Sequence, residues 1–146
     1  MVSTTLFASE KDDWETPQWL FDELDKEFGF NLDVAANCHN AKCQNYYDIE
    51  SDGLIQPWKG VCWCNPPYGR NVGKWVMKAH MAAMRGITTV MLLPARTDTR
   101  YFHDYIYGRY EIRFLKGRLK FEGAKNTAPF PSMIVVFAIN GMEVSP

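Results

Sequence analysis

Asn65-Pro66-Pro67-Tyr68 is the stretch of this chain whose residue types point most directly to chemistry. It follows a short apolar run, residues 61–64, that is typical of a buried strand. Two adjacent prolines donate no backbone hydrogen bonds and fix φ at about −65°, so the strand ends here and the chain turns. The turn presents an amide side chain, a free proline carbonyl and an aromatic ring. Together these can hold a planar amino group and stack on the ring that carries it, which suits group transfer to an exocyclic amine.

The amino group of a nucleobase is a poor nucleophile, because its lone pair is delocalised into the ring. If Asn65 and the carbonyl of Pro66 accept its two hydrogens, the nitrogen is biased toward a tetrahedral geometry and can attack an electrophilic methyl group. In a duplex the target atom is out of reach, so the base must rotate out and stack on Tyr68. The alternative is an ordinary proline turn after a strand, since Pro and Asn are common in loops.

Two further segments are candidates for binding a cofactor. Asp33 ends a short strand, residues 30–34, and an acid there either accepts from an ammonium group or ribose hydroxyl or caps a turn. Trp14-Glu15-Thr16-Pro17 opens a helix, and it either packs as an ordinary helix start or lies against the cofactor. The chain has no GxGxxG loop, which favours a cofactor without phosphates.

Basic residues cluster late in the chain and are interleaved with aromatic ones, as on a phosphate-binding face. Arg96 and Arg100 follow the third strand and are expected near the active face, and Arg118 and Lys120 lie further on. Acidic neighbours weaken this signal, so a solvated surface is the alternative. The 3 His and 4 Cys residues do not have the spacing of metal ligands, and we expect no metal site.

Helices and strands alternate along the chain. Apolar periodicity predicts helices at residues 16–28, with Thr16 as N-cap, Pro17 at the first helical position and Gly29 as C-cap, and at 74–85 and 99–107. Strands are predicted at 30–34, 61–64, 88–93, 110–115 and 133–139, and 118–121 is a candidate for a half-exposed one. This order predicts an α/β fold with a mostly parallel sheet, helices on both faces and room for an antiparallel C-terminal edge.

The length of 146 residues fits one domain, and a hydrophobic content of 47% is enough for one core. Because the formal net charge is only −1, a nucleic-acid-binding surface must be local. No apolar run reaches the roughly 20 residues that span a membrane, and the N-terminus does not resemble a signal peptide. We therefore expect a cytoplasmic protein with reduced cysteines, in which residues 1–13 form a flexible arm.

Taken together, these motifs resemble those of the phage-type DNA N-6-adenine methyltransferases, also called Dam-like. Asn-Pro-Pro-Tyr alone is shared with other amino methyltransferases, but its combination with the other segments is more specific. The resemblance extends in order from Trp14 to Ile139, and the matching text is WETPQWLFDELDKEFGFNLDVAAN, NAKC, DGLIQPW, CNPPYG, LLPARTDTRYFH, GRLKF and APFPS.

The resemblance implies a single Rossmann-like methyltransferase domain over residues 14–146 that uses S-adenosylmethionine and acts on DNA, in the bacterial host cell if a phage encodes it. The residues implied to hold the flipped adenine are Asn65, Pro66, Pro67 and Tyr68. Those implied at the cofactor are Trp14, Thr16, Pro17, Asp33, Ala35 and Asn65, with Asp48, and Asp52 behind it, as candidates for the ribose. Contacts with DNA are expected at Arg96, Arg100, Arg118 and Lys120.

Other functions remain open on the residues alone. Methylation of cytosine N4 or of RNA uses much the same turn. A protein-glutamine methyltransferase generally carries a glycine-rich cofactor loop, which this chain lacks. A non-catalytic DNA-binding module could keep the fold, but an intact Asn65 and Tyr68 argue against it. The sequence therefore predicts an adenine-N6 DNA methyltransferase and leaves the oligomeric state open.

Overall fold

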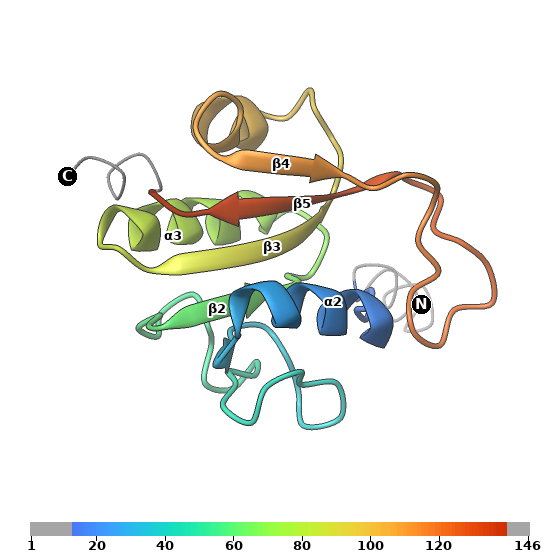
Figure 1. The fold of residues 1–146 in the computed structure, drawn as a ribbon, viewed down its shortest axis with the longest axis horizontal. Helices are drawn as coiled ribbons and strands as arrows, with labels where there is room; N and C mark the ends of the chain where they lie inside the picture. The colour runs from blue at the N-terminus through green and yellow to red at the C-terminus, as the bar shows by residue number, and fades with distance from the viewer. Residues whose placement is uncertain (1–12, 140–146) are drawn as a thin grey trace, which may run out of the picture.

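The computed structural model describes residues 13–139, so most of the predicted N-terminal arm lies outside the described residues. The elements along the chain are α2 (Gln18–Phe28), β1 (Leu32–Asp33), β2 (Val61–Cys64), α3 (Val72–Met84), β3 (Thr88–Pro94), the π-helical turn η1 (Phe102–Ile106), β4 (Glu111–Phe114) and β5 (Ser132–Phe137). Figure 1 shows how the strands lie side by side in one layer. The alternation of helix and strand predicted from the sequence is confirmed.

The strands form one five-stranded sheet in the order β1-β2-β3-β5-β4. β1, β2 and β3 are parallel, and β5 runs antiparallel to both β3 and β4. Thus β5 alone is reversed, and the expectation of a mostly parallel sheet holds. The expected place of the C-terminal strand at the edge is wrong. β5 is inserted between two strands because all six of its residues are buried and need neighbours on every side.

Helices cover both faces of the sheet. Successive side chains of a strand point to opposite faces, so Cys62 and Cys64 pack toward α3 while Trp63 packs toward α2. The same alternation continues along β3 and β5. One face is covered by α3 and η1. The other is covered by α2 and by the β4–β5 connection, residues 115–131.

The outer side of β1 carries a further short pairing. The Asp33 N–H donates to Asn45 O at 3.0 Å, the Tyr47 N–H donates to Asp33 O at 2.9 Å, and Asp33 and Tyr46 form a parallel bridge. The chain therefore builds outward from β1 first and then returns to the other side of β1 to form β2. Open α/β sheets bind ligands at the carboxyl ends of the strands where such a reversal occurs.

The first turn of α2 differs from the expectation. The helix begins at Gln18 with an extended Pro17 before it, and the hydroxyl of Thr16 does not cap it. The cap comes from far along the chain, since the Glu122 carboxylate accepts the Gln18 N–H at 2.9 Å. Gly29 ends the helix in the left-handed region with φ of 70°, as predicted.

The β4–β5 connection reaches across the molecule to the start of α2, as the orange segment in Figure 1 shows. Residues 118–121 are not a strand, which corrects the sequence-based expectation. Their alternation has another cause, because Leu119 and Phe121 are buried against the α2 side of the sheet while their neighbours stay exposed.

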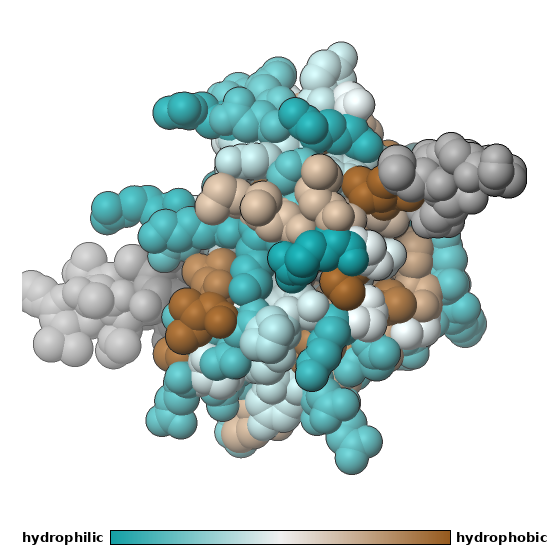
Figure 2. All heavy atoms as spheres, turned by 90° about the vertical axis from the view of Figure 1, so that its left-hand side faces the viewer, coloured by the Kyte–Doolittle hydropathy of each residue, from teal (hydrophilic) through white to brown (hydrophobic). Residues whose placement is uncertain are grey.

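The remaining helical predictions are close in position but differ in extent. α3 begins two residues before the predicted 74–85, and only η1, a single turn, forms within 99–107. On the face shown in Figure 2, hydrophobic patches are separated by hydrophilic side chains. In the described part of the chain, no helix is long and apolar enough to cross a membrane.

The capping contact of Glu122 gives a stability prediction. Glu122→Ala removes the acceptor of the Gln18 N–H and a negative charge at the start of α2, so the free energy of unfolding should fall by about 1 kcal/mol. Urea denaturation measures it. The control is Glu23→Ala, which removes only an exposed ion pair with Lys26 and should change stability by less than about 0.5 kcal/mol. Equal effects of the two variants would contradict a cap.

Candidate active site

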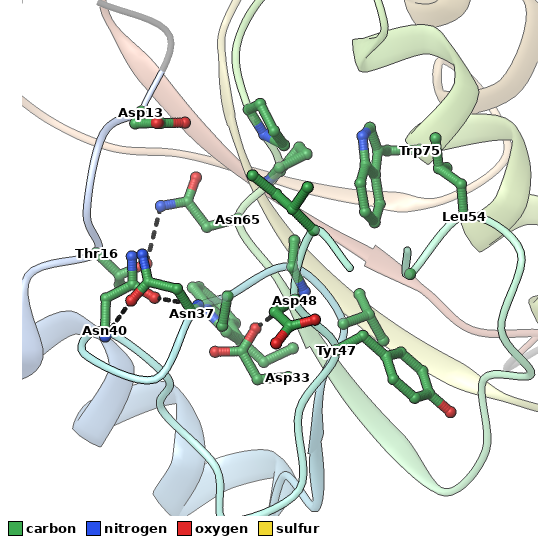
Figure 3. A pocket seen from close by; sticks show the side chains of 18 of the residues that line it. Asp13, Thr16, Asp33, Asn37, Asn40, Tyr47, Asp48, Leu54, Asn65 and Trp75 are labelled. Atoms are coloured by element: carbon green, nitrogen blue, oxygen red, sulfur yellow. Dashed lines mark hydrogen bonds between the residues drawn. The ribbon is translucent and has the colours of Figure 1, made fainter. Parts of the chain in front are cut away.

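A cavity of about 490 Å³ opens at the carboxyl ends of β1 and β2, where the direction of sheet construction reverses. This volume lies in the range of roughly 300–1,000 Å³ typical of small-molecule sites. Its lining comes from the segment before α2, the loop after β1, the loop after Tyr47 and the turn after β2. In Figure 3, Thr16 and Asn65 lie at one end, Trp75 and Leu54 at the other, and Asp33 and Asp48 between them.

The carboxamide of Asn65 is held at one end of this cavity. Its Nδ2 donates to the backbone oxygen of Trp14 and, at 3.0 Å, to Oγ1 of Thr16. Its Oδ1 is buried and has no hydrogen-bond partner within residues 13–139. An unsatisfied buried acceptor costs about 1–3 kcal/mol, so a ligand that donates a hydrogen bond here would recover that free energy.

The two prolines complete the corner. Pro66 is buried, and its carbonyl accepts no hydrogen bond within residues 13–139, whereas Pro67 is exposed. Both line the cavity. Among the described residues, the corner therefore carries two acceptors without a hydrogen-bond partner, the side-chain oxygen of Asn65 and the carbonyl of Pro66.

Asp33 is the acid of the cavity wall. Its side chain is buried, with the residue only 2% exposed, and its two oxygens accept the N–H groups of Ala35 at 3.2 Å and Lys42 at 2.9 Å. Burial raises the pKa of Asp33 from 3.8 to about 6, although those two hydrogen bonds oppose the rise. Asp33 thus shapes the loop after β1 and also lines the cavity, so both of its predicted roles fit its position.

The other predicted cofactor residues of this wall, Ala35 and Asp48, also line the cavity, as does Asp52 behind Asp48. Asp48 follows the segment that pairs with β1, and its Oδ1 accepts from both the N–H and the hydroxyl of Ser51, at 2.9 and 3.0 Å. These hydrogen bonds lower the pKa of Asp48, so its carboxylate is ionised at neutral pH.

The far end of the cavity is apolar and tightly built. Trp75 of α3 and Leu54 line it, next to Gly53. A Cβ on Gly53 would lie 2.0 Å from Val34 O and 3.1 Å from the Trp75 ring, so only glycine fits there. A flat apolar group can rest against the indole of Trp75 at this end.

Within residues 13–139, no group of three or more His, Cys, Asp or Glu side chains is arranged to hold a metal ion. Cys62 and Cys64 are buried in the sheet, and burial raises the pKa of both thiols, which makes them packing residues rather than reactive ones.

Comparison with known proteins shows the family of this chain. The family model for DNA N-6-adenine-methyltransferase (Dam) matches residues 3–139. The chain belongs to this family. It is 31% identical over 118 residues to the DNA N-6-adenine-methyltransferase of Haemophilus phage HP1 (strain HP1c1), covering 79% of this chain and 68% of that relative. It is 33% identical over 113 residues to the enzyme of the same name from Escherichia phage T1, covering 75% of this chain and 47% of the relative. The resemblance inferred from the motifs is confirmed.

Within the Asn65–Tyr68 turn, Tyr68 is the residue whose placement differs from the expectation. Tyr68 is only 3% exposed and does not line the cavity. Its hydroxyl donates a hydrogen bond to Leu92 O at 3.0 Å. Phe121 and Phe130 of the β4–β5 connection cover the ring edge-on, with centroids 6.4 and 5.8 Å away. In this conformation the Tyr68 ring is not available for stacking, because it completes an aromatic cluster.

The segment before α2 reaches the site in a different way from the one expected. Trp14 and Thr16 line the cavity, while Pro17 is buried and does not. The hydroxyl of Thr16 is engaged by Asn65. Trp14 and Thr16 therefore contact Asn65 directly, besides lining the cavity.

The four predicted DNA-binding residues, Arg96, Arg100, Arg118 and Lys120, are all exposed. Within residues 13–139, none of them forms an ion pair, so their charges are available to a polyanion. The Arg96 guanidinium lies 5.9 Å from the centre of the Phe130 ring. Arg113, by contrast, is paired with Glu27 and Glu111, and these contacts raise its pKa.

Sequence reasoning missed Trp75, Gly53 and Arg70 as cavity residues. Trp75 lies on the apolar stripe of α3 and looks like an ordinary core residue. Gly53 is recognisable only from the close approach of Val34. Arg70 does carry a signal, since it follows Tyr68-Gly69 directly and is exposed at the cavity.

The raised pKa of Asp33 predicts how stability depends on pH. The folded protein holds this proton up to a pH of about 6 but the unfolded chain only to about 4, so ionisation destabilises the fold as pH rises through this window. A shift of this size corresponds to about 3 kcal/mol. Asp33→Asn lacks the effect, so its free energy of unfolding relative to wild type should rise by up to that amount between pH 4 and pH 7.

Urea denaturation across the pH range checks this. Asp48→Asn is the control, because the lowered pKa of Asp48 gives the opposite sign: its stabilising contribution is lost as pH falls. A wild-type curve parallel to that of Asp33→Asn would contradict the raised pKa.

Proposed function

We propose that this chain transfers a methyl group from S-adenosylmethionine to the N6 amino group of adenine in DNA, with the target base rotated out of the helix. Residues 14–146 form its methyltransferase domain. The phage relatives support action on DNA inside a bacterial cell. The observation that carries the proposal is the Asn65 carboxamide. Its nitrogen donates to Trp14 and Thr16, and its oxygen is buried beside the cavity with no hydrogen-bond partner among residues 13–139.

The two acceptors that have no partner in the described part of the chain match the two donors of an exocyclic amine. An amino group on a base carries two N–H donors, and the corner has the Oδ1 of Asn65 and the carbonyl of Pro66 to receive them. Hydrogen bonds to both hydrogens draw electron density onto the nitrogen and restrict its orientation. Because the acceptors are already in place, little reorganisation is needed when charge develops on the nitrogen. The proton that the nitrogen loses passes to solvent or to the surroundings of Asn65.

The cavity residues fit S-adenosylmethionine. When bound, this cofactor supplies an electrophilic methyl group on a sulfonium. Asp33 would hold its ammonium group or, with Asp48, its hydroxyls, and Trp75 would contact its base at the apolar end. Two carboxylates, and an amide oxygen that has no partner within residues 13–139, favour a cationic, donor-rich ligand over a phosphate-bearing one.

A Rossmann-like methyltransferase fold is part of the proposal. The sheet order, the reversed β5 next to the last position and the cavity at the switch point all support it. Stacking of the base on Tyr68 requires Phe121 and Phe130 to move off the ring.

Cytosine N4 also presents an amino group with two hydrogens, so the corner alone does not choose between the bases. Family membership favours adenine, and the names of both phage relatives specify it. A non-catalytic DNA-binding module gains nothing from a buried, unsatisfied acceptor at a cavity. These observations favour an enzyme acting on adenine.

Asn65→Ala tests the function. Loss of the acceptor should lower methyl transfer by at least about a hundredfold, while cofactor affinity measured by calorimetry stays within a few-fold of wild type. Unmodified DNA is incubated with labelled cofactor and digested to nucleosides, and the methylated base is identified by mass spectrometry. Asn45→Ala, which alters an exposed asparagine outside the cavity, is the matched control. Label on cytosine, or normal turnover in Asn65→Ala, would refute the assignment.

Arg100→Ala tests the DNA face. If Arg100 neutralises a phosphate, its loss should weaken binding similarly for all sequences and reduce the slope of log K against log salt by about 1. Arg85→Ala removes another exposed charge, at the end of α3 just before β3 begins, whereas Arg100 follows the end of β3, and this variant should leave the slope as in wild type. Fluorescence anisotropy over a salt series distinguishes the two. An unchanged slope in Arg100→Ala would remove this residue from the interface.

A further inference from the structure

An asparagine side chain has two nearly isosteric ends. Rotation by 180° about its last torsion exchanges an acceptor oxygen for a donor NH₂ group, and the two orientations differ little in intrinsic energy. Only one of them serves the proposed chemistry. With the NH₂ group toward the cavity, Asn65 would set its donors against the N–H groups of an incoming amine.

The contacts of Asn65 distinguish these orientations. The backbone oxygen of Trp14 can only accept, so the end of the carboxamide that faces it must be Nδ2. The hydroxyl of Thr16 can donate or accept, so it would tolerate either end. It accepts from the same Nδ2 at 3.0 Å and thereby adds a second restraint in the same direction. Figure 3 shows this contact at the cavity wall.

We propose that Trp14 and Thr16 are positioning residues for catalysis, which hold the Asn65 carboxamide with its oxygen toward the substrate. This inference rests on the proposed function of Asn65 and assigns the Trp-Glu-Thr-Pro segment to that residue. Trp14 selects the orientation through its carbonyl, and Thr16 stabilises it through its hydroxyl.

The placement of the Trp14 carbonyl depends on its own side chain. The Trp14 indole packs against Phe121 and Phe130 at centroid distances of 5.3 and 5.2 Å, both nearer than the T-shaped contacts of Tyr68. Both phenylalanines belong to the β4–β5 connection. The indole thus anchors the backbone that faces Asn65, although 51 positions separate Asn65 from Trp14.

The side chain of Thr16 contacts Asn65 and not the helix that it precedes. The residue is only 4% exposed, and its hydroxyl does not cap α2. Glu122 caps the helix in its place, and the hydroxyl of Thr16 instead accepts a hydrogen bond from Asn65.

Thr16→Val tests the inference, because it keeps the shape of the side chain and removes the hydroxyl. Turnover at saturating cofactor and DNA should fall about tenfold, with KM for DNA and Kd for the cofactor within about twofold of wild type. Thr16→Ser keeps the hydroxyl and should restore most of the turnover. Thr89→Val is the control. It changes another buried threonine, which lies near the start of β3 and does not line the cavity.

A second measurement does not depend on activity. In protein labelled with ¹⁵N at asparagine, the side-chain NH₂ signals of Asn65 are identified by their absence in Asn65→Ala. In Thr16→Val, one of these protons should shift upfield and exchange faster with water, and Thr16→Ser should resemble wild type. In the double variant with Asn65→Ala, the Thr16 change should have no further effect on turnover.

Two results would overturn the inference. One is an Asn65 amide signal and turnover in Thr16→Val that equal those of wild type. The other is a weakened cofactor affinity with normal turnover at saturation, which would make Thr16 a cofactor contact. If the wild-type chain methylates no adenine, the proposed function fails, and the amide signals alone then decide whether Thr16 orients Asn65.

Discussion

The hydrogen bond from Asn65 to the Trp14 carbonyl is the constraint on which the site depends. A backbone carbonyl cannot donate, so this contact turns a two-ended amide into a fixed acceptor facing the cavity. This contact requires Asn65 and the Trp14 carbonyl to lie at the same edge of the sheet. The proline pair stops β2 and turns Asn65 outward at the switch point, while α2 carries the segment before it to the same edge of the sheet.

The cavity wall adds electrostatics to this geometry. Asp33 is buried, and keeping it ionised at neutral pH costs folding free energy, as its raised pKa indicates. A cation bound at the cavity would offset this cost by favouring the charged carboxylate. The buried Asp33 and the Asn65 oxygen, which has no partner in the described part of the chain, thus favour the same kind of ligand, one with positive charge and hydrogen-bond donors. Loops that cradle phosphates provide the opposite, an array of backbone donors.

Local patterns were sufficient to predict most elements and the position of Asn65. Apolar periodicity located α2, α3 and the buried strands, and the chemistry of proline located the turn after β2. The errors arose where contacts with residues distant in sequence determine the position or the hydrogen-bond partner of a residue. Thr16 has the residue type of an N-cap, but its hydroxyl is taken by Asn65, and Glu122, 104 positions from Gln18, caps the helix instead. The insertion of β5 and the burial of Tyr68 likewise depend on tertiary packing that no local window contains.

The proposed reaction requires an exposed Tyr68 ring and a fixed orientation of Asn65, and the same aromatic cluster affects both. Phe121 and Phe130 cover Tyr68, and they also hold the indole of Trp14. If the β4–β5 connection moves to expose Tyr68 to a base, the anchor of the Trp14 carbonyl loosens at the moment when the orientation of Asn65 matters. The hydroxyl of Thr16 lies outside this cluster and contacts Asn65 directly. The same connection also holds the backbone on both sides of Thr16, because the Glu122 N–H donates to Glu15 O at 3.0 Å and the Glu122 carboxylate accepts the Gln18 N–H. Both restraints on Asn65 therefore depend on the position of the β4–β5 connection, so any movement that exposes Tyr68 must leave the contacts of Glu122 in place if Asn65 is to keep its orientation.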